Sequence, residues 1–91
     1  MNIDVSKIRD LYTLYGFEQL EETKNYLVFS HSEGYFCNAE ILQLNLAQDI
    51  SAIRRQYEDT GYSVKVSAYS SIEDIHRRLF SGFFSQRNIT Q

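Results

Sequence analysis

The spacing of apolar residues along the chain predicts three amphipathic helices. They cover residues 4–17, 45–62 and 70–84, where apolar side chains recur every three or four positions. The expected buried stripes comprise Ile8, Leu11, Tyr12 and Tyr15 in the first helix, Leu46, Ile50, Ile53 and Tyr57 in the second, and Ile72, Ile75, Leu79, Phe80 and Phe83 in the third. Each stripe needs a sheet or another helix to cover it, which predicts a layered domain.

Residues typical of helix N-termini stand at the start of each segment. Asp4 is the predicted cap of the first helix, because a short polar side chain there can accept a hydrogen bond from the first turn. Asn45 is expected to cap the second helix, with Gln48 completing a capping box. Ser70 or Ser71 is expected to cap the third.

Between the helices the period changes to the two-residue alternation of strands. NYLVFSH (25–31) and YFCNAEILQLN (35–45) predict a hairpin, and YSVKVSAY (62–69) predicts a further strand. FEQLEETKNY (17–26) fits either a short polar edge strand or an irregular connection. The order α-β-β-(β)-α-β-α follows. It is an α/β (α+β) fold, with three helices on a mixed sheet of three or four strands, in one domain covering residues 1–91.

The hairpin contains the most reactive-looking stretch, HSEGYFC at residues 31–37, which holds a histidine and the only cysteine. With a loop at residues 32–34, Cys37 is expected opposite Phe29, in apolar surroundings where the thiol is inert. His31 is then a diagonal neighbour of Cys37, about 7–8 Å away. A nucleophile and its base need about 3 Å, so we expect no catalytic dyad. A two-residue loop would instead place the two side chains on opposite faces.

Neither a metal nor a cofactor is expected. Zinc needs three or four ligands, and the only histidine besides His31 is His76, in the third predicted helix. The sequence has none of the glycine-rich phosphate-binding, serine-hydrolase or metalloprotease motifs.

The opposite face of the hairpin offers one polar alternative. The same register places Tyr26 across from Glu40 and Val28 across from Asn38. Two interpretations stay open. One is a sheet face that is solvated at one end and covered at the other. The second is an unrecognised enzyme with a polar site of Tyr26, Asn38 and Glu40.

Four arginines stand in two adjacent pairs on the predicted helices, Arg54 with Arg55 and Arg77 with Arg78. An acidic residue lies four positions from each arginine, on the same helix face. These residues are Glu58, Asp59, Glu73 and Asp74. The pattern favours solvated surface ion pairs, and the alternative is a nucleic-acid contact through the four arginines.

The third helix ends in aromatic residues. Phe83 continues the apolar stripe, whereas Phe84 falls about a third of a turn away from it, and Gly82 weakens the helix by about 1 kcal/mol relative to alanine. We expect the helix to fray here. Phe83 and Phe84 are the predicted partner-binding residues, with the alternative that Phe84 folds back onto the sheet.

Composition narrows the class of protein. Hydrophobic residues make up 43% and charged residues 23%, as in an ordinary folded domain. The net charge of −3 opposes binding to the phosphate backbone of nucleic acids. A single cysteine, an N-terminal stretch without an apolar core and the lack of a long apolar run suit a cytoplasmic protein that binds no membrane.

The element order resembles the core of the restriction-endonuclease-like nucleases. In that family the second and third strands carry an acidic residue and a D/E-x-K triplet. Here NYLVFSH has no acidic residue, and Glu40 in AEILQL is followed two positions on by Leu42 instead of lysine. The resemblance covers most of the chain and implies a copy that lacks catalysis.

The sequence therefore predicts a small, non-catalytic, cytoplasmic protein-interaction domain, either homo-oligomeric or a module of a longer chain. A degenerate nuclease-like or other nucleic-acid-binding domain is one alternative. The enzyme with the Tyr26, Asn38 and Glu40 site is the other.

Overall fold

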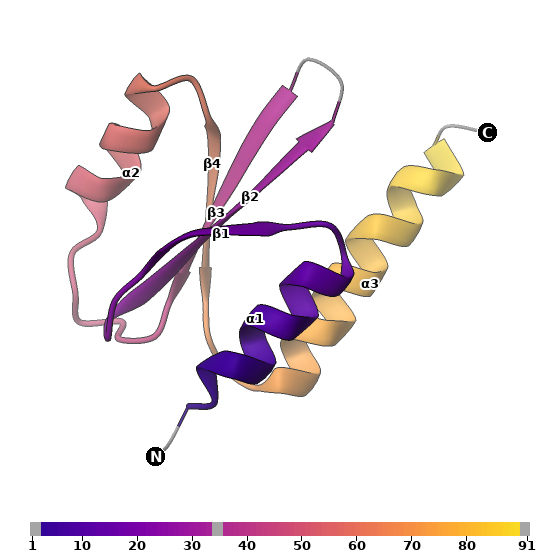
Figure 1. The fold of residues 1–91 in the computed structure, drawn as a ribbon, viewed down its shortest axis with the longest axis horizontal. Coiled ribbons are helices and arrows are strands. Elements are labelled where there is room, and N and C mark those ends of the chain that lie inside the picture. Colours follow the sequence, from indigo (N-terminus) through magenta and orange to yellow (C-terminus); the bar gives the residue numbers. More distant parts are fainter. Residues whose placement is uncertain (1–2, 34–35, 90–91) are drawn as a thin grey trace. The chain divides into compact units, whose positions relative to one another are not determined.

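The computed structural model describes residues 3–33 and 36–89, with side chains outside 32–37 and 82–89. The elements are α1 (Val5–Leu14), β1 (Glu18–Glu22), β2 (Tyr26–Glu33), β3 (Phe36–Gln43), α2 (Ser51–Asp59), β4 (Ser63–Ala68) and α3 (Ile72–Ile89) (Figure 1). This order confirms the predicted α+β fold. It also shows that part of the open segment 17–26 forms a strand, so the sheet has four strands.

The chain divides into two compact units. One comprises Met1–Gly16 with Ser70–Gln91 and thus holds α1 and α3. The other is Phe17–Tyr69 and holds the sheet and α2.

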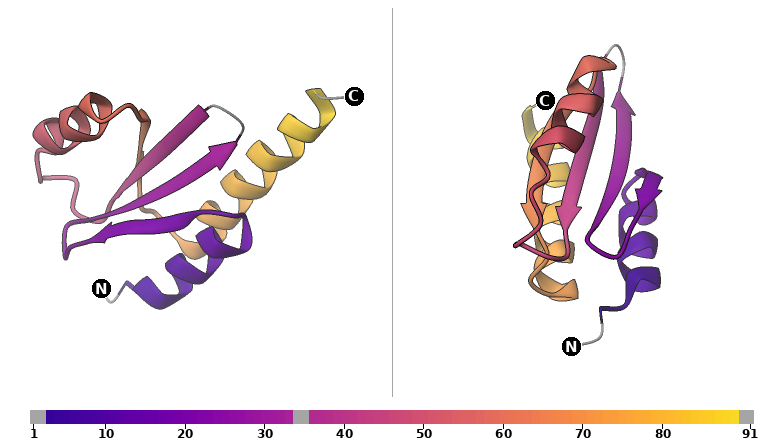
Figure 2. Two further views of the ribbon diagram at one scale, coloured as in Figure 1. Left: turned by 45° about the horizontal axis from the view of Figure 1, so that its top comes forward. Right: turned by 90° about the vertical axis from the view of Figure 1, so that its left-hand side faces the viewer.

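The sheet in the second unit has the strand order β1-β2-β3-β4. The first three strands form an antiparallel meander, and β4 joins β3 in parallel after the crossover through α2. Figure 2 shows α2 alongside the sheet. In β1 the register shifts between Gln19 and Glu21, which is a bulge at Leu20.

The register of the β2–β3 hairpin differs from the prediction. The ladder continues to the pair Glu33 and Phe36, so the three-residue loop at 32–34 was wrong. Phe29 pairs with Glu40 instead of Cys37. The register differs because Ser32 and Glu33 belong to β2 and pair with Cys37 and Phe36 of β3.

The apolar core of this unit lies on the sheet face that α2 covers. Strand alternation gives this face Tyr26 and Val28 from β2, and Ala39 and Ile41 from β3. Val28 and Ile41 are fully buried. From α2 and its flanks the predicted stripe residues Ile50, Ile53 and Tyr57 pack against this face, as do Tyr62, Val64 and Val66 around β4.

Helix α2 begins at Ser51, six residues after the predicted cap at Asn45. The Asn45 side chain accepts from the Ala47 N–H at 3.0 Å and closes a turn instead of a helix. The backbone N–H of Asn45 donates to the carbonyl of Asn25 at 3.1 Å, which holds this turn to the start of β2. Leu46 is 69% exposed as a result and does not belong to the stripe.

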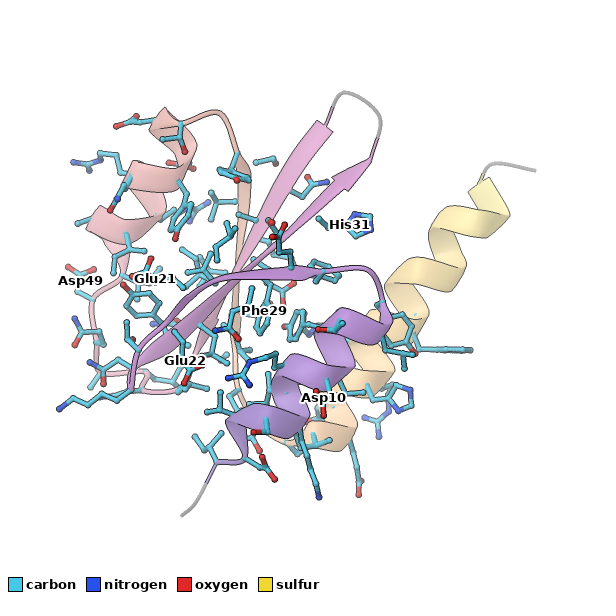
Figure 3. The ribbon with its side chains drawn as sticks, viewed as in Figure 1. Asp10, Glu21, Glu22, Phe29, His31 and Asp49 are labelled. Atoms are coloured by element: carbon cyan, nitrogen blue, oxygen red, sulfur yellow. The ribbon has the colours of Figure 1, made fainter. Side chains whose placement is uncertain are left out.

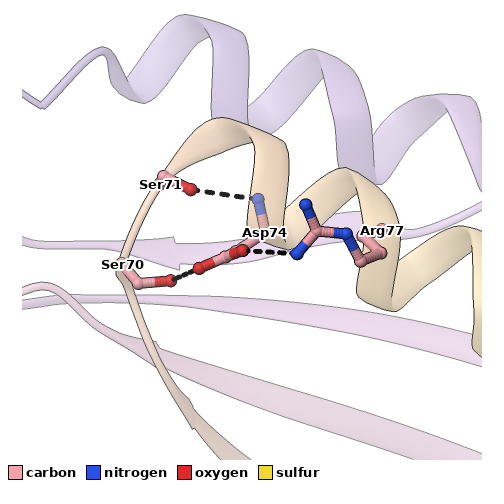
Figure 4. A network of polar contacts seen from close by, with 4 residues as sticks. All are labelled: Ser70, Ser71, Asp74 and Arg77. Carbon is pink, nitrogen blue, oxygen red and sulfur yellow. Dashed lines mark hydrogen bonds and ion pairs between the residues drawn. The ribbon is translucent and has the colours of Figure 1, made fainter.

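The predicted caps of the first unit are confirmed. The Asp4 carboxylate accepts from the Lys7 N–H at 3.1 Å at the start of α1. At the start of α3, the Ser71 hydroxyl accepts from the Asp74 N–H at 3.0 Å, and Ser70 donates to the Asp74 carboxylate at 2.6 Å (Figure 4). The hydrogen bond from Ser70, and then the charge of Arg77, lower the pKa of Asp74 below its ordinary value.

Helix α3 differs from its prediction in two respects. Its backbone continues through Gly82 to Ile89 without fraying. Ile75 and Leu79 are buried, whereas Phe80 is 55% exposed and lies outside the buried stripe. Each residue turns the helix by about 100°, so the position after Leu79 points well away from the side that Leu79 buries.

Replacing Phe80 with alanine is therefore expected to cost only about 1 kcal/mol of the free energy of unfolding, because half of the ring is already in water. Urea denaturation of the two proteins measures this difference. A loss of about 3–5 kcal/mol, as for a fully buried aromatic residue, would place Phe80 in the core after all.

Candidate functional site

Glu40, in the middle of β3, occupies the position that the nuclease resemblance makes decisive. It lies on the sheet face opposite to the α2 core, together with Leu42, and pairs with Phe29 of β2. The three side chains are buried, with exposed fractions of 5% for Glu40, 1% for Phe29 and 0% for Leu42. The carboxylate thus has apolar neighbours in Leu42 along β3 and Phe29 across on β2, whereas its partner on β4 is the exposed Lys65.

In the part of the chain that the structure describes, the residues around Glu40 do not form a set of metal ligands. No three His, Cys, Asp or Glu side chains gather there. No buried side-chain nitrogen or oxygen of the described residues lacks a hydrogen-bond partner, so Glu40 is satisfied within the fold. A hydrolytic metal centre needs several oxygen or nitrogen ligands and an open position.

The predicted polar site of Tyr26, Asn38 and Glu40 does not form. Tyr26 pairs with Gln43, and Val28 pairs with Ile41. Because side chains alternate, Tyr26 points to the α2 face while Glu40 points to the other. The alternative interpretation, a polar site that joins Tyr26 to Glu40, was therefore wrong.

Tyr26 instead belongs to a carboxylate site at the edge of the sheet. Glu21 of β1 (labelled in Figure 3) accepts a hydrogen bond from the Tyr26 hydroxyl at 2.6 Å. Its second oxygen accepts from the Tyr57 hydroxyl at 2.7 Å. One side chain thereby joins β1, β2 and α2, and both distances are typical of a hydroxyl donating to a carboxylate.

Both phenols are held in the neutral form. Burial, followed by the hydrogen bond to Glu21 and its negative charge, raises the pKa of Tyr26 to about 12. The same causes raise the pKa of Tyr57 above its ordinary value. The arrangement fixes three elements to one another and places no reactive atom in the open, so we interpret it as structural.

These shifts give an expected pH dependence. The unfolded tyrosines lose their protons near pH 10, whereas folded Tyr26 keeps its proton until about pH 12. The folded state therefore binds more protons between these values, and stability falls as the pH rises through that window. Urea denaturation at several pH values should show the loss beginning near pH 10, and a smaller loss in Tyr26→Phe. An unchanged midpoint up to pH 12 would contradict the hydrogen-bonded pair.

Sequence comparison decides the family. The sequence model of a family described as NACHT-associated inactive Restriction Endonuclease 2 matches residues 7–91, nearly the whole chain. The chain belongs to this family. No curated protein and no solved structure matches it significantly.

The family's description agrees with the geometry at Glu40. This member of the family has the α-β-β-β-α-β-α order and a buried carboxylate on β3. Leu42, with none of its surface exposed, occupies the position of the triplet lysine. The neighbouring positions on β2 hold Phe29 and Leu27. The sequence alone predicted the missing lysine, and the structure adds that the position is core.

The four arginines of this family member divide between the two units. Arg54 on α2 pairs with Glu58 at 3.4 Å, as predicted. On α3 the predicted pairs were wrong, because Asp74 pairs with Arg77 at 2.9 Å (Figure 4) and Arg78 donates to the Tyr12 hydroxyl at 3.1 Å.

The remaining predicted residues concern parts of the domain that the structure describes incompletely. The backbone of Cys37 pairs with Ser32 and that of His31 with Asn38, but the prediction of a buried thiol falls outside the described side chains. The His31 ring contacts Phe17 at 5.1 Å between centroids. Phe83 and Phe84, the predicted partner-binding residues, also fall outside the described side chains. None of the described helices has the length and apolar character to cross a membrane.

Proposed function

We propose that this chain is a non-catalytic protein-interaction domain, working either as a module of a longer protein or as a homo-oligomer. The observation that carries the proposal is the place of Glu40, which is buried beside Phe29 and Leu42 with no second carboxylate opposite it on β2. A nuclease must hold a metal and a water at this place, whereas here the lysine position of the triplet is the buried Leu42 and the facing position on β2 is the buried Phe29.

The family's description supports this proposal. It is NACHT-associated and inactive, so we infer that this copy acts beside a NACHT partner and contributes binding instead of cleavage. A folded domain without catalytic activity can still act by binding another molecule through its surface. Likeness of fold alone does not identify that partner.

A cleavage assay tests the non-catalytic part. The purified chain is incubated with DNA and with RNA in the presence of Mg²⁺ or Mn²⁺, beside a Glu40→Gln variant of nearly the same shape. We expect both proteins to leave the substrates intact. Cleavage by the wild type that is lost in Glu40→Gln would overturn the proposal.

A binding assay tests the interaction part. The chain is passed over immobilised NACHT protein from the same source, and separately examined by sedimentation across a concentration series. We expect it to bind the NACHT protein, itself, or both. A chain that stays monomeric and does not bind the NACHT protein would contradict the proposed interaction role. A gel shift at low salt, of which we expect none, would instead favour the nucleic-acid alternative.

A further inference from the structure

The two edge strands of the sheet are unlike each other. Strand β1 contains a bulge at Leu20 and three glutamates in five residues, and both features discourage pairing with another strand. Strand β4 pairs with β3 over six consecutive residues without a bulge, and its only charged residue is Lys65. The β4 edge is therefore the one suited to accept a further strand.

The direction of the β4 backbone groups follows from one hydrogen bond. The N–H of Tyr69 donates to the carbonyl of Gln43 on β3 at 2.8 Å. Backbone groups alternate in direction along a strand, so those of Ser63, Lys65 and Ser67 also point to β3. The N–H and C=O groups of Val64, Val66 and Ala68 point outward from the sheet, on the side of β4 where no strand of the described residues pairs.

The apolar core thins out at this edge. Val28 and Ile41, in the central strands, are fully buried. Val64 and Val66, on the same face of β4, are only partly buried, as is Tyr62 just before the strand. Within this unit the apolar layer thus ends at β4 with its side chains partly in water, and a strand added there would cover them.

We propose that β4 binds the β4 strand of a second copy of this chain, antiparallel, about a two-fold axis at Val66. This register pairs Val66 with Val66 and Val64 with Ala68, all of which carry outward backbone groups. It joins two four-stranded sheets into one and removes both β4 edges. The inference deepens the proposed interaction role by naming the surface and the partner.

The charge of Lys65 selects this register over its neighbour. A pairing centred on Lys65 would set two like charges directly opposite each other, which is destabilising. Centring on Val66 sets Lys65 opposite Ser67 of the other copy and aligns apolar side chains on the α2 face. In this register the strand pairs with a second copy of itself with no like charges opposed and with its apolar side chains aligned on one face, which is why we infer a second copy and not an unrelated peptide.

Sedimentation equilibrium of the wild-type chain gives the first test, with a concentration-dependent dimer as the expected result. A matched pair of variants then tests the register. Ser67→Glu places a carboxylate opposite Lys65 of the other copy, whereas Ser67→Lys places a second ammonium there, and both introduce a long charged side chain at the same position. We expect the dimer dissociation constant of Ser67→Lys to exceed that of Ser67→Glu by roughly tenfold. This difference should shrink in high salt.

A second pair tests the backbone. Val66→Pro removes an outward N–H without removing a bond to β3, and should weaken the dimer by at least roughly tenfold. Val66→Thr keeps the N–H and the β-branched shape, so its dimer should persist. Circular dichroism and urea denaturation of the variants confirm that each is folded, and the Ser67 pair gives the answer should Val66→Pro fail to fold.

A wild-type chain that stays monomeric at every concentration would overturn the inference, as would open-ended polymers or a dimer whose dissociation constant is equal in the two Ser67 variants. These outcomes are separate from failure of the proposed function. A monomer that still binds the NACHT protein loses only the β4 dimer, whereas Glu40-dependent cleavage removes the non-catalytic role and leaves the dimer untouched.

Discussion

Replacing Leu42 with lysine is expected to lower the free energy of unfolding by at least about 3 kcal/mol. The substitution restores the D/E-x-K spacing with Glu40, so in an intact nuclease fold it would repair the triplet. Here Leu42 has no exposed surface, and an ammonium at this place loses its hydration among apolar neighbours. Urea denaturation of Leu42→Lys and the wild type measures the effect.

The matched control is Leu42→Met, which keeps the volume and the apolar character and should cost less than about 1.5 kcal/mol. We also expect Leu42→Lys to acquire no metal-dependent cleavage of DNA, because β2 supplies no second carboxylate beside Glu40. A stable Leu42→Lys protein that cleaves DNA would show that the nuclease site is only one substitution from working.

Replacing Glu21 with alanine is the second large expected loss, at about 2–3 kcal/mol. The substitution removes the acceptor of two hydroxyl groups at once and leaves Tyr26 and Tyr57 as partly buried donors. It also removes the hydrogen bond by which Glu21 of the edge strand β1 holds Tyr57 of α2. Thermal or urea denaturation gives the magnitude.

Two further measurements separate this explanation from a general loss of packing. Glu21→Gln keeps one acceptor oxygen and should cost less than Glu21→Ala. In a double-mutant cycle with Tyr57→Phe, the two losses should fall short of additivity, since both remove the same hydrogen bond. The pKa of Tyr26 should also fall below 12 in Glu21→Ala, as read from tyrosinate absorbance. Additive losses with an unchanged tyrosine titration would contradict the three-residue site.

Local signals in the sequence predicted the elements well. Asp4 and Ser71 cap α1 and α3 as expected, because a short polar side chain before an apolar stripe has few other uses. The alternation in residues 62–69 predicted β4 and the inward positions of Val64 and Val66. These features depend on neighbours along the chain, which the sequence displays directly.

Features set by distant partners could not be predicted in this way. Asn45 is a residue type that often caps helices. Its backbone, however, binds Asn25, twenty positions earlier, and Asn45 forms a turn instead of the start of a helix. The hairpin register depended on the length of one loop, and the misplaced loop moved every pair by three positions. The Tyr26–Glu40 hypothesis failed for that reason alone.

The carboxylate site at Glu21 was missed altogether. Tyr26 lies five positions from Glu21, but Tyr57 lies 36 positions away. The signal available was modest. Glu21 is one of two half-buried positions in an alternating polar strand, and a half-buried carboxylate needs hydrogen-bond donors. Recognising it required knowing that residues 18–22 form a strand at the edge beside Tyr26.

Titration calorimetry of Mn²⁺ into the chain, with Glu40→Gln as the reference, tests most directly that the nuclease position has become core. We expect the two proteins to give the same trace, because Glu40 is buried beside Phe29 and Leu42 and is satisfied within the fold. Saturable binding of the ion by the wild type that disappears in Glu40→Gln would contradict this expectation. It would mean that Glu40 still binds a metal.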